Sequence, residues 1–371
     1  MKYRAIHSLG EIMLLFFVLL LVPILLQQLV VKEGNVRYAV YQRRNKIAIT
    51  FFFLFLTVLV ALRHESVGND TGNYVQHFEK VSNMSWYEVF EKSVEFGFSL
   101  FNKIVLLASQ KAQIFFAVAA VAVSAMIYPT YKRLCVDASL TIVLFCTMST
   151  FFLMFSGIRQ MLAVGLGVVA YELTRKKKLV FFILLVLFAM TFHTSAFMIA
   201  FMYPLYHVKI TKNWLIVVVP VSVAVFIFNR PIFSFLSLII ERYTQYEGGV
   251  SSTGAYTMLI LFAIFAVFSF LIPDENRMDE EMVGLRNFLL FSLLLQMFAP
   301  LHLLAMRMNY YYTIFIPVLI PKIIGCSHET WSRVSIWARH IMLVFFLGYF
   351  FLNAYFGNSL HVFPYRFFWE S

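Results

Sequence analysis

Of the 371 residues, 61% are hydrophobic and only 13% are charged, and the mean hydropathy is +0.79. A soluble protein of this length needs a more highly charged surface, so the composition excludes a soluble enzyme and predicts a membrane protein. The net charge of +11 comes mainly from lysines and arginines in short loops, which favours an orientation signal over a nucleic-acid-binding surface. We therefore expect membrane lipids among the partners of this protein, and no nucleic acid.

The apolar segments predict an all-α, polytopic integral membrane helical bundle of about 10–12 spans, forming a single membrane domain over residues 1–371. The clearest segments are 10–31, 46–62, 111–128, 138–155, 157–174, 213–229, 255–272, 285–303, 308–325 and 335–356. A further stretch, 179–207, is interrupted at Thr191–Ser195. It predicts either one long helix or two short helices that meet at His193.

Basic loops set the expected orientation, because lysine and arginine are enriched on the cytoplasmic side of membrane proteins. The strongest cluster is Arg175–Lys178, and the basic residues of 32–46, Lys132–Arg133 and Lys209 agree with it. With these loops in the cytoplasm, 63–95 becomes a folded external loop with short helices. The Gly- and Ser-rich loop 241–255 becomes a flexible external loop.

Two local patterns refine the external region. Ser85 and Glu88 have the spacing of a capping box, which predicts that a short helix begins at Trp86. Segment 96–109 is amphipathic, so we expect a re-entrant or in-plane helix there rather than a full crossing.

Ionisable residues occur at the ends of several apolar segments. They are Arg63, Asp70, Glu95, Arg159, His193 and Arg307. A charge near the middle of a bilayer costs about 2.5–3.5 kcal/mol on insertion scales, so each needs a partner, a wet cavity or an interface. All six fall on the outer side, although the orientation was chosen from loops that exclude them. The sequence therefore predicts one polar site that faces the outer compartment.

Each candidate also has a simpler interpretation. Asp70 could cap a turn. Arg159, which is next to Gln160, could extend to the membrane interface instead of binding a phosphate. His193 could be a polar group at a helix break, and Arg307 could belong to an interfacial aromatic belt. The cysteines lack metal-ligand spacing and no nucleotide-binding motif is visible, so neither a metal nor another cofactor is expected.

The order of the polar motifs resembles the EpsG family of Wzy-like bacterial polymerases of exopolysaccharide, capsule and O-antigen. The matching motifs are Arg63, Gly68-x-Asp70-x-x-x-Tyr74, Glu95-x-Gly97-Phe98, Ser156-Gly157-Ile158-Arg159-Gln160, Phe192-His193-Thr194-Ser195, Arg307 and Pro364-Tyr365-Arg366-Phe367-Phe368. The resemblance runs from about residue 50 to the end of the chain.

This resemblance implies transfer of a growing glycan from undecaprenyl diphosphate to a new lipid-linked repeat, at the outer face of the bacterial cytoplasmic (inner) membrane. The expected partners are the undecaprenyl-diphosphate-linked oligosaccharide and a chain-length regulator and flippase of the same pathway. The substrate-binding candidates are Arg63, Tyr74, Arg159, Gln160, Arg307 and Tyr310. The alternatives are a ligase or another lipid-glycan glycosyltransferase and, in a different class, a flippase or transporter of the lipid-linked repeat.

Three residues are candidates for the base that takes the proton of the acceptor hydroxyl: Glu95, Asp70 and His193. Glu95 is favoured because it opens the segment that enters the outer leaflet, where partial burial would raise the affinity of a carboxylate for protons. His193 is the competing candidate.

The topology is tested by labelling single cysteines, in a cysteine-free background, with a membrane-impermeant reagent in intact cells. We expect labelling at Ser252→Cys, in the external loop 241–255, and none at Lys177→Cys, in the strongest basic loop. The reverse pattern would overturn both the orientation and the shared outer site.

Overall fold

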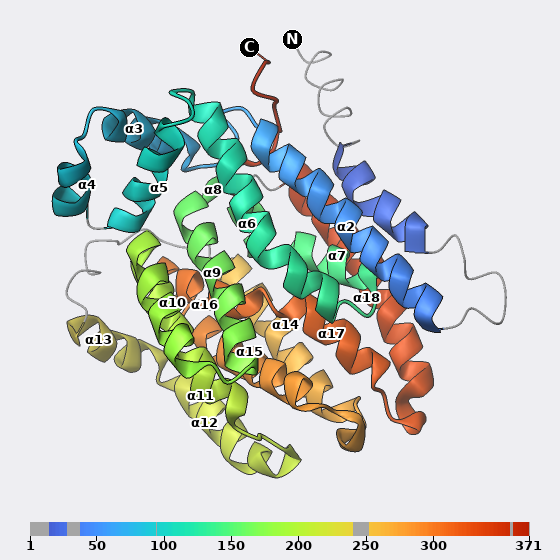
Figure 1. Cartoon of the computed structure of the whole chain (residues 1–371). Helices are drawn as coiled ribbons and strands as arrows, with labels where there is room; N and C mark the ends of the chain where they lie inside the picture. Colours follow the sequence, from blue (N-terminus) through green and yellow to red (C-terminus); the bar gives the residue numbers. More distant parts are fainter. Residues whose placement is uncertain (1–14, 28–37, 94, 240–251, 357–358, 371) are drawn as a thin grey trace. The chain divides into compact units, whose positions relative to one another are not determined.

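The computed structural model describes residues 15–27, 38–93, 95–239, 252–356 and 359–370. The described part is mainly helical and its only β-structure is two isolated β-bridges, which confirms the predicted all-α membrane fold (Figure 1). It packs as two compact units, Met1–Phe197 with Trp337–Ser371 (unit 1) and Met198–Ile336 (unit 2). The single membrane domain stays a prediction, and most of loop 241–255 lies outside the described residues.

Among the described residues, four to seven candidate spans can be identified, against the about 10–12 that the sequence predicts. Four helices are long and apolar enough to cross a membrane alone: α2 (Tyr38–Leu62), α6 (Ala112–Leu134), α14 (Ser252–Leu271) and α18 (Ser332–Phe356). Three bent pairs qualify when each is taken as one span: α7 (Ala138–Thr147) with α8 (Ser149–Ser156), Thr194–His207 with Lys212–Ile227, and α16 (Leu303–Thr313) with α17 (Ile316–Gly325). Within the described ranges, several continuous apolar segments of the sequence are therefore short or bent helices.

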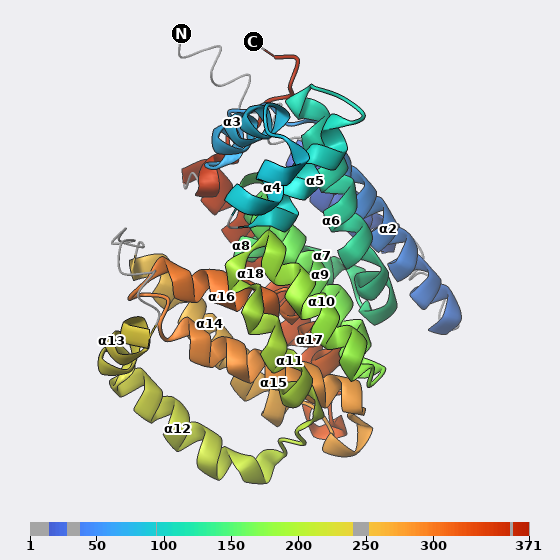
Figure 2. The ribbon, with the colours of Figure 1, turned by 60° about the vertical axis from the view of Figure 1, so that its left-hand side comes forward.

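In unit 1, α2 packs against α6, α6 against α9 (Ile158–Arg175), and α9 against α10 (Leu179–Phe192). The helices α3 (Thr71–Ser82), α4 (Trp86–Lys92) and α5 (Phe96–Leu106) lie together at the end of unit 1 where the C-terminal segment also lies (Figures 1 and 2). Because α5 is only about 16 Å long at 1.5 Å per residue, it cannot cross the hydrocarbon core.

The capping box that begins α4 is confirmed. The Ser85 hydroxyl accepts a hydrogen bond from the backbone N–H of Glu88 at 3.2 Å, and the Glu88 carboxylate accepts one from the backbone N–H of Ser85 at 2.8 Å. Two N–H groups that would otherwise lack a partner are satisfied, which lets a helix of seven residues form.

The C-terminal segment 359–370 is fastened to the C-terminal end of α2. The backbone N–H of His64 donates to the carbonyl of Arg366 at 2.8 Å, and the hydroxyl of Tyr365 donates to the carbonyl of Leu59 at 2.7 Å. These bonds join parts of the chain about 300 residues apart in sequence, so the fold of this end depends on the C-terminus.

Gly68 completes this connection. Its backbone N–H donates to the carbonyl of His361 at 2.9 Å, and its φ of +96° favours glycine. A Cβ here would also lie 2.4 Å from the carbonyl oxygen of Phe155. The loop that leads into α3 is thus held between α8 and the C-terminal segment.

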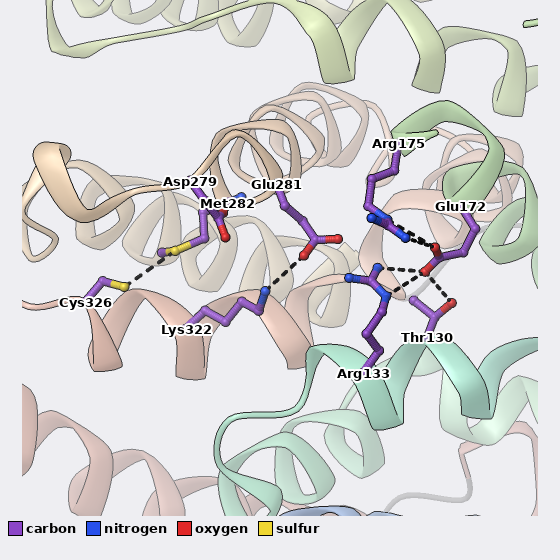
Figure 3. A network of polar contacts seen from close by, with 9 residues as sticks. All are labelled: Thr130, Arg133, Glu172, Arg175, Asp279, Glu281, Met282, Lys322 and Cys326. Atoms are coloured by element: carbon purple, nitrogen blue, oxygen red, sulfur yellow. Dashed lines mark hydrogen bonds and ion pairs between the residues drawn. The ribbon is translucent and has the colours of Figure 1, made fainter. Parts of the chain in front are cut away.

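Near the C-terminal end of α9, Glu172 joins two of the basic loops that were predicted to be cytoplasmic. Its carboxylate pairs with Arg133 of α6 at 2.7 Å and with Arg175 at 3.0 Å, and accepts a hydrogen bond from Thr130 at 3.2 Å (Figure 3). Because Arg133 and Thr130 lie on α6 and Glu172 lies on α9, their contacts hold these two helices together.

Unit 2 is built around α15 (Glu280–Gln296), which packs against α14, α16 and α11 (Met202–His207). Arg286 of α15 is buried and donates to the carboxylate of Glu275 and the carbonyl of Ile210. Lys322 of α17 pairs with Glu281 at 3.3 Å (Figure 3). The bond from Arg286 to Glu275 holds the short 3₁₀ helix η4 (Glu275–Arg277) against α15, and the Lys322–Glu281 pair joins α17 to α15.

The helices α12 (Leu215–Ile227) and α13 (Asn229–Ile239) lie at the edge of unit 2 (Figure 2). No residue of α12 is buried, although almost all of its side chains are apolar. A helix that is apolar on all sides suits a lipid environment.

The Tyr365 hydrogen bond can be tested by a stability measurement. Tyr365→Phe should lower the free energy of unfolding by about 1–2 kcal/mol, because a buried bond to a backbone carbonyl is lost. The matched control is Tyr349→Phe in α18, because the hydroxyl of Tyr349 has no hydrogen bond within the described part of the chain. Equal thermal unfolding curves for both variants would contradict the role given to the C-terminal segment.

Candidate active site

The carboxylate of Glu95 is the centre of a polar cluster in unit 1. Its Oε1 accepts hydrogen bonds from Nδ1 of His193 at 2.8 Å, the backbone N–H of Thr194 at 3.0 Å and the Thr194 hydroxyl at 3.2 Å. Its Oε2 accepts one from Nη1 of Arg159 at 2.8 Å. The start of α5, the start of α9 and the end of α10 therefore meet at one side chain.

The break in the stretch 179–207 creates half of this cluster. Of the two alternatives, the structure has short helices that meet at His193: α10 ends at Phe192, and a 3₁₀ helix, Thr194–Phe201, follows. Because Thr194 opens this new helix, its backbone N–H has no bond to a preceding turn and can donate to Glu95.

Gly97 allows α5 to approach α10 closely enough for these bonds. A Cβ on Gly97 would lie 2.0 Å from the hydroxyl oxygen of Thr191. Any side chain here would move α5 away from the end of α10. In the Glu95-x-Gly97 motif, Glu95 thus supplies the carboxylate, and Gly97 supplies the space that the close packing of α5 and α10 needs.

The environment of Glu95 keeps it ionised. Burial alone would raise its pKa, but the hydrogen bond and charge of His193, the charge of Arg159 and the Thr194 N–H together lower the pKa to about 2. Burial acts in the direction expected from the sequence, but the donors around the carboxylate outweigh its desolvation.

An ionised carboxylate can only accept hydrogen bonds, so Nδ1 of His193 carries a proton. In the neutral imidazole, the lone pair then lies on Nε2, for which the described residues provide no partner. Glu95 thus fixes both the tautomer and the orientation of His193.

Arg159 is the most exposed member of the cluster, with 44% of its side-chain surface accessible against 12% for Glu95. Its guanidinium lies 5.7 Å from the ring centre of Phe98 and 5.9 Å from that of Tyr74. An arginine that served only as an interfacial anchor would not need a buried carboxylate. One nitrogen of the Arg159 guanidinium instead pairs with Glu95, while much of the side chain is exposed and can bind an anion.

Three further candidates lie in the same unit. Asp70 precedes α3 and is half-buried, and its carboxylate makes no capping hydrogen bond, so the simple capping interpretation does not hold. Tyr74 is buried beside Arg159, and Gln160 is buried in the first turn of α9.

Three further candidates are not among the donors to Glu95 described above. Arg63 is fully buried, donates to the carbonyl of Val60 and lies 4.6 Å from the ring centre of Phe116. Arg307 and Tyr310 belong to α16 of unit 2, where Arg307 is half-buried and Tyr310 is buried. A second arginine acting together with Arg159 stays a prediction.

The sequence model of the EpsG family matches residues 46–367, which is most of the chain. The chain belongs to the EpsG family. No curated protein and no solved structure matches it. Membership in the EpsG family supports a polysaccharide-polymerase-like role of the glycosyltransferase type in a multi-pass membrane protein.

All candidate residues of this EpsG-family protein lie within the matched range. Thr194, Gly97 and Phe98 also belong to the site but were not among the predicted site residues, because they carry no charge. In the sequence, only their position next to Glu95 and His193 in the quoted motifs indicated that they belong to the site. Within the described ranges, no three His, Cys, Asp or Glu side chains gather in a way that could hold a metal ion.

The steric role of Gly97 predicts that Gly97→Ala lowers the melting temperature by several degrees, because the added methyl group separates α5 from α10. Gly348→Ala in α18 is the matched control, since a Cβ there meets nothing within 4 Å and alanine is the better helix former. If both variants melt like the parent protein, the close contact between α5 and Thr191 is not needed.

Proposed function

We propose that this protein polymerises lipid-linked oligosaccharide repeats in the synthesis of exopolysaccharide, capsule or O-antigen. It transfers the growing glycan from undecaprenyl diphosphate to an acceptor hydroxyl of a new lipid-linked repeat. Membership in the EpsG family supports the polymerase class. The single observation that supports the chemistry is that Arg159 and His193 both contact the carboxylate of Glu95.

The leaving group explains the need for an open arginine. When the bond between the anomeric carbon and the diphosphate oxygen breaks, negative charge grows on the diphosphate. A guanidinium fixed beforehand stabilises that charge without having to reorganise during the reaction. The ion pair with Glu95 at 2.8 Å fixes Arg159, and its exposed side can bind the phosphate oxygens.

The acceptor hydroxyl must lose a proton as its oxygen bonds to the anomeric carbon. We assign this step to Nε2 of His193 rather than to Glu95, which was favoured from the sequence. Glu95 accepts four hydrogen bonds and pairs with Arg159, so it is a weak proton acceptor that holds His193 in place. Asp70, whose carboxylate makes no capping bond, is proposed to bind the acceptor.

The arrangement of α9 supports a site on the outer face. Arg159 and Arg175 stand near opposite ends of this helix, about 24 Å apart along its axis at 1.5 Å per residue. The basic end of α9 is predicted to be cytoplasmic. The Arg159 end would then lie at the outer side of the bacterial cytoplasmic membrane, where it would meet substrate that a flippase delivers and a chain-length regulator controls.

An assay with purified protein and lipid-linked repeats, which serve as both donor and acceptor, tests this function. Arg159→Lys should lose most polymerisation, because an ammonium cannot reproduce a bidentate grip. His193→Gln should reduce the rate at least a hundredfold, in the range of general base catalysis. The control is Arg43→Lys, an exposed arginine in α2 that, among the described residues, has no hydrogen bond or ion pair with Glu95, His193 or Arg159.

Each variant is first checked for correct insertion and folding. Parental rates for both Arg159→Lys and His193→Gln would reject the assigned chemistry. Folded parent protein that extends no chain, but transfers the glycan to a different acceptor, would indicate a ligase instead.

A further inference from the structure

A second histidine lies beside the cluster, and no motif in the sequence pointed to it. His77 is on α3, one turn after Tyr74, and its ring is half-buried. Its Nε2 lies 3.2 Å from the hydroxyl of Ser99 on α5. The ring also stacks on Phe98, with 5.2 Å between ring centres and 27° between planes. Two contacts on α5 therefore fix the orientation of this imidazole.

The ring of Phe98 connects His77 to the site. Phe98 is buried, and besides His77 it supports the guanidinium of Arg159 at 5.7 Å and the ring of Tyr74 at 5.7 Å. His77 and Arg159 thus rest on one aromatic side chain. A group next to a phosphate bound by Arg159 would be within reach of His77.

His77 carries no charge at neutral pH. Burial, the charge of Arg159 and the charge of Lys80 lower its pKa, and Glu95 opposes them only in part. A neutral imidazole offers one donor and one acceptor. Because Ser99 occupies Nε2, one ring nitrogen, Nδ1, remains without a hydrogen bond to any described residue.

These features suit an uncharged ligand group better than a phosphate. Phosphate oxygens are best held by cations such as Arg159, whereas a sugar hydroxyl can both donate and accept a neutral hydrogen bond. In a glycosyl diphosphate, the sugar next to the diphosphate is the nearest source of such hydroxyls.

We propose that His77, held by Ser99 and Phe98, forms a sugar-binding subsite whose Nδ1 hydrogen-bonds a hydroxyl of the sugar attached to the diphosphate. This inference rests on the proposed function and adds to it a residue that selects the donor sugar. It assigns His77 to binding, and it leaves proton transfer to His193 and diphosphate binding to Arg159.

The test compares two substitutions of His77 in the polymerisation assay. His77→Phe keeps the stacking on Phe98 but removes both ring nitrogens, and His77→Ala removes both features. We expect each to raise KM for the lipid-linked repeat roughly tenfold, the effect of one neutral hydrogen bond, with a smaller change in kcat. His64→Ala is the matched control, because among the described residues its ring bonds only to nearby Ser66.

Donor analogues that lack single hydroxyls on the first sugar identify the contact. One such analogue should raise KM for the parent protein but not for His77→Phe, since the partner is already absent. A parental KM for His77→Phe, or equal sensitivity of both proteins to every analogue, would overturn the subsite. If Arg159→Lys is inactive in the same experiment, the proposed polymerase function stands even when the subsite fails.

Discussion

The arrangement of the site depends on a partly buried negative charge and its donors. A carboxylate removed from water is tolerated only when its oxygens are paired, and Glu95 receives two donors from side chains with positive or polar character and two from Thr194. These donors come from two other segments of the chain. Satisfying this one charge therefore fixes the relative positions of α5, α9 and α10.

Helix α9 carries a second carboxylate cluster at the end opposite Arg159. Glu172 pairs with Arg133 and Arg175, while Arg159 pairs with Glu95. Most side chains between these two ends of α9 are apolar and buried. A helix with paired charges at both ends and an apolar middle matches the profile of a bilayer.

Arg63 shows that an arginine in a family motif can act within the fold. It is fully buried against Phe116, under the segment that carries Tyr365, and its Nε and Nη2 have no hydrogen bond in the structure. Contact with an aromatic ring offsets part of the cost of burying such a charge. The position of Arg63 links the C-terminal segment to the loop before α3, and this loop leads to Tyr74 and His77.

Local signals in the sequence were sufficient for the helical membrane class, the capping box at Ser85 and the interruption at His193, because each depends on residues that are neighbours in the chain. Tertiary structure decided which polar groups meet. Glu95 lies 98 residues from His193 and 64 from Arg159, and their contact depends on the absence of a side chain at Gly97. Spans surrounded by lipid need no polar face, so their sequences lack the periodicity that reveals packing partners in soluble helices. For the same reason, the burial of Arg63, the low pKa of Glu95 and the place of His77 could be found only from the packed structure.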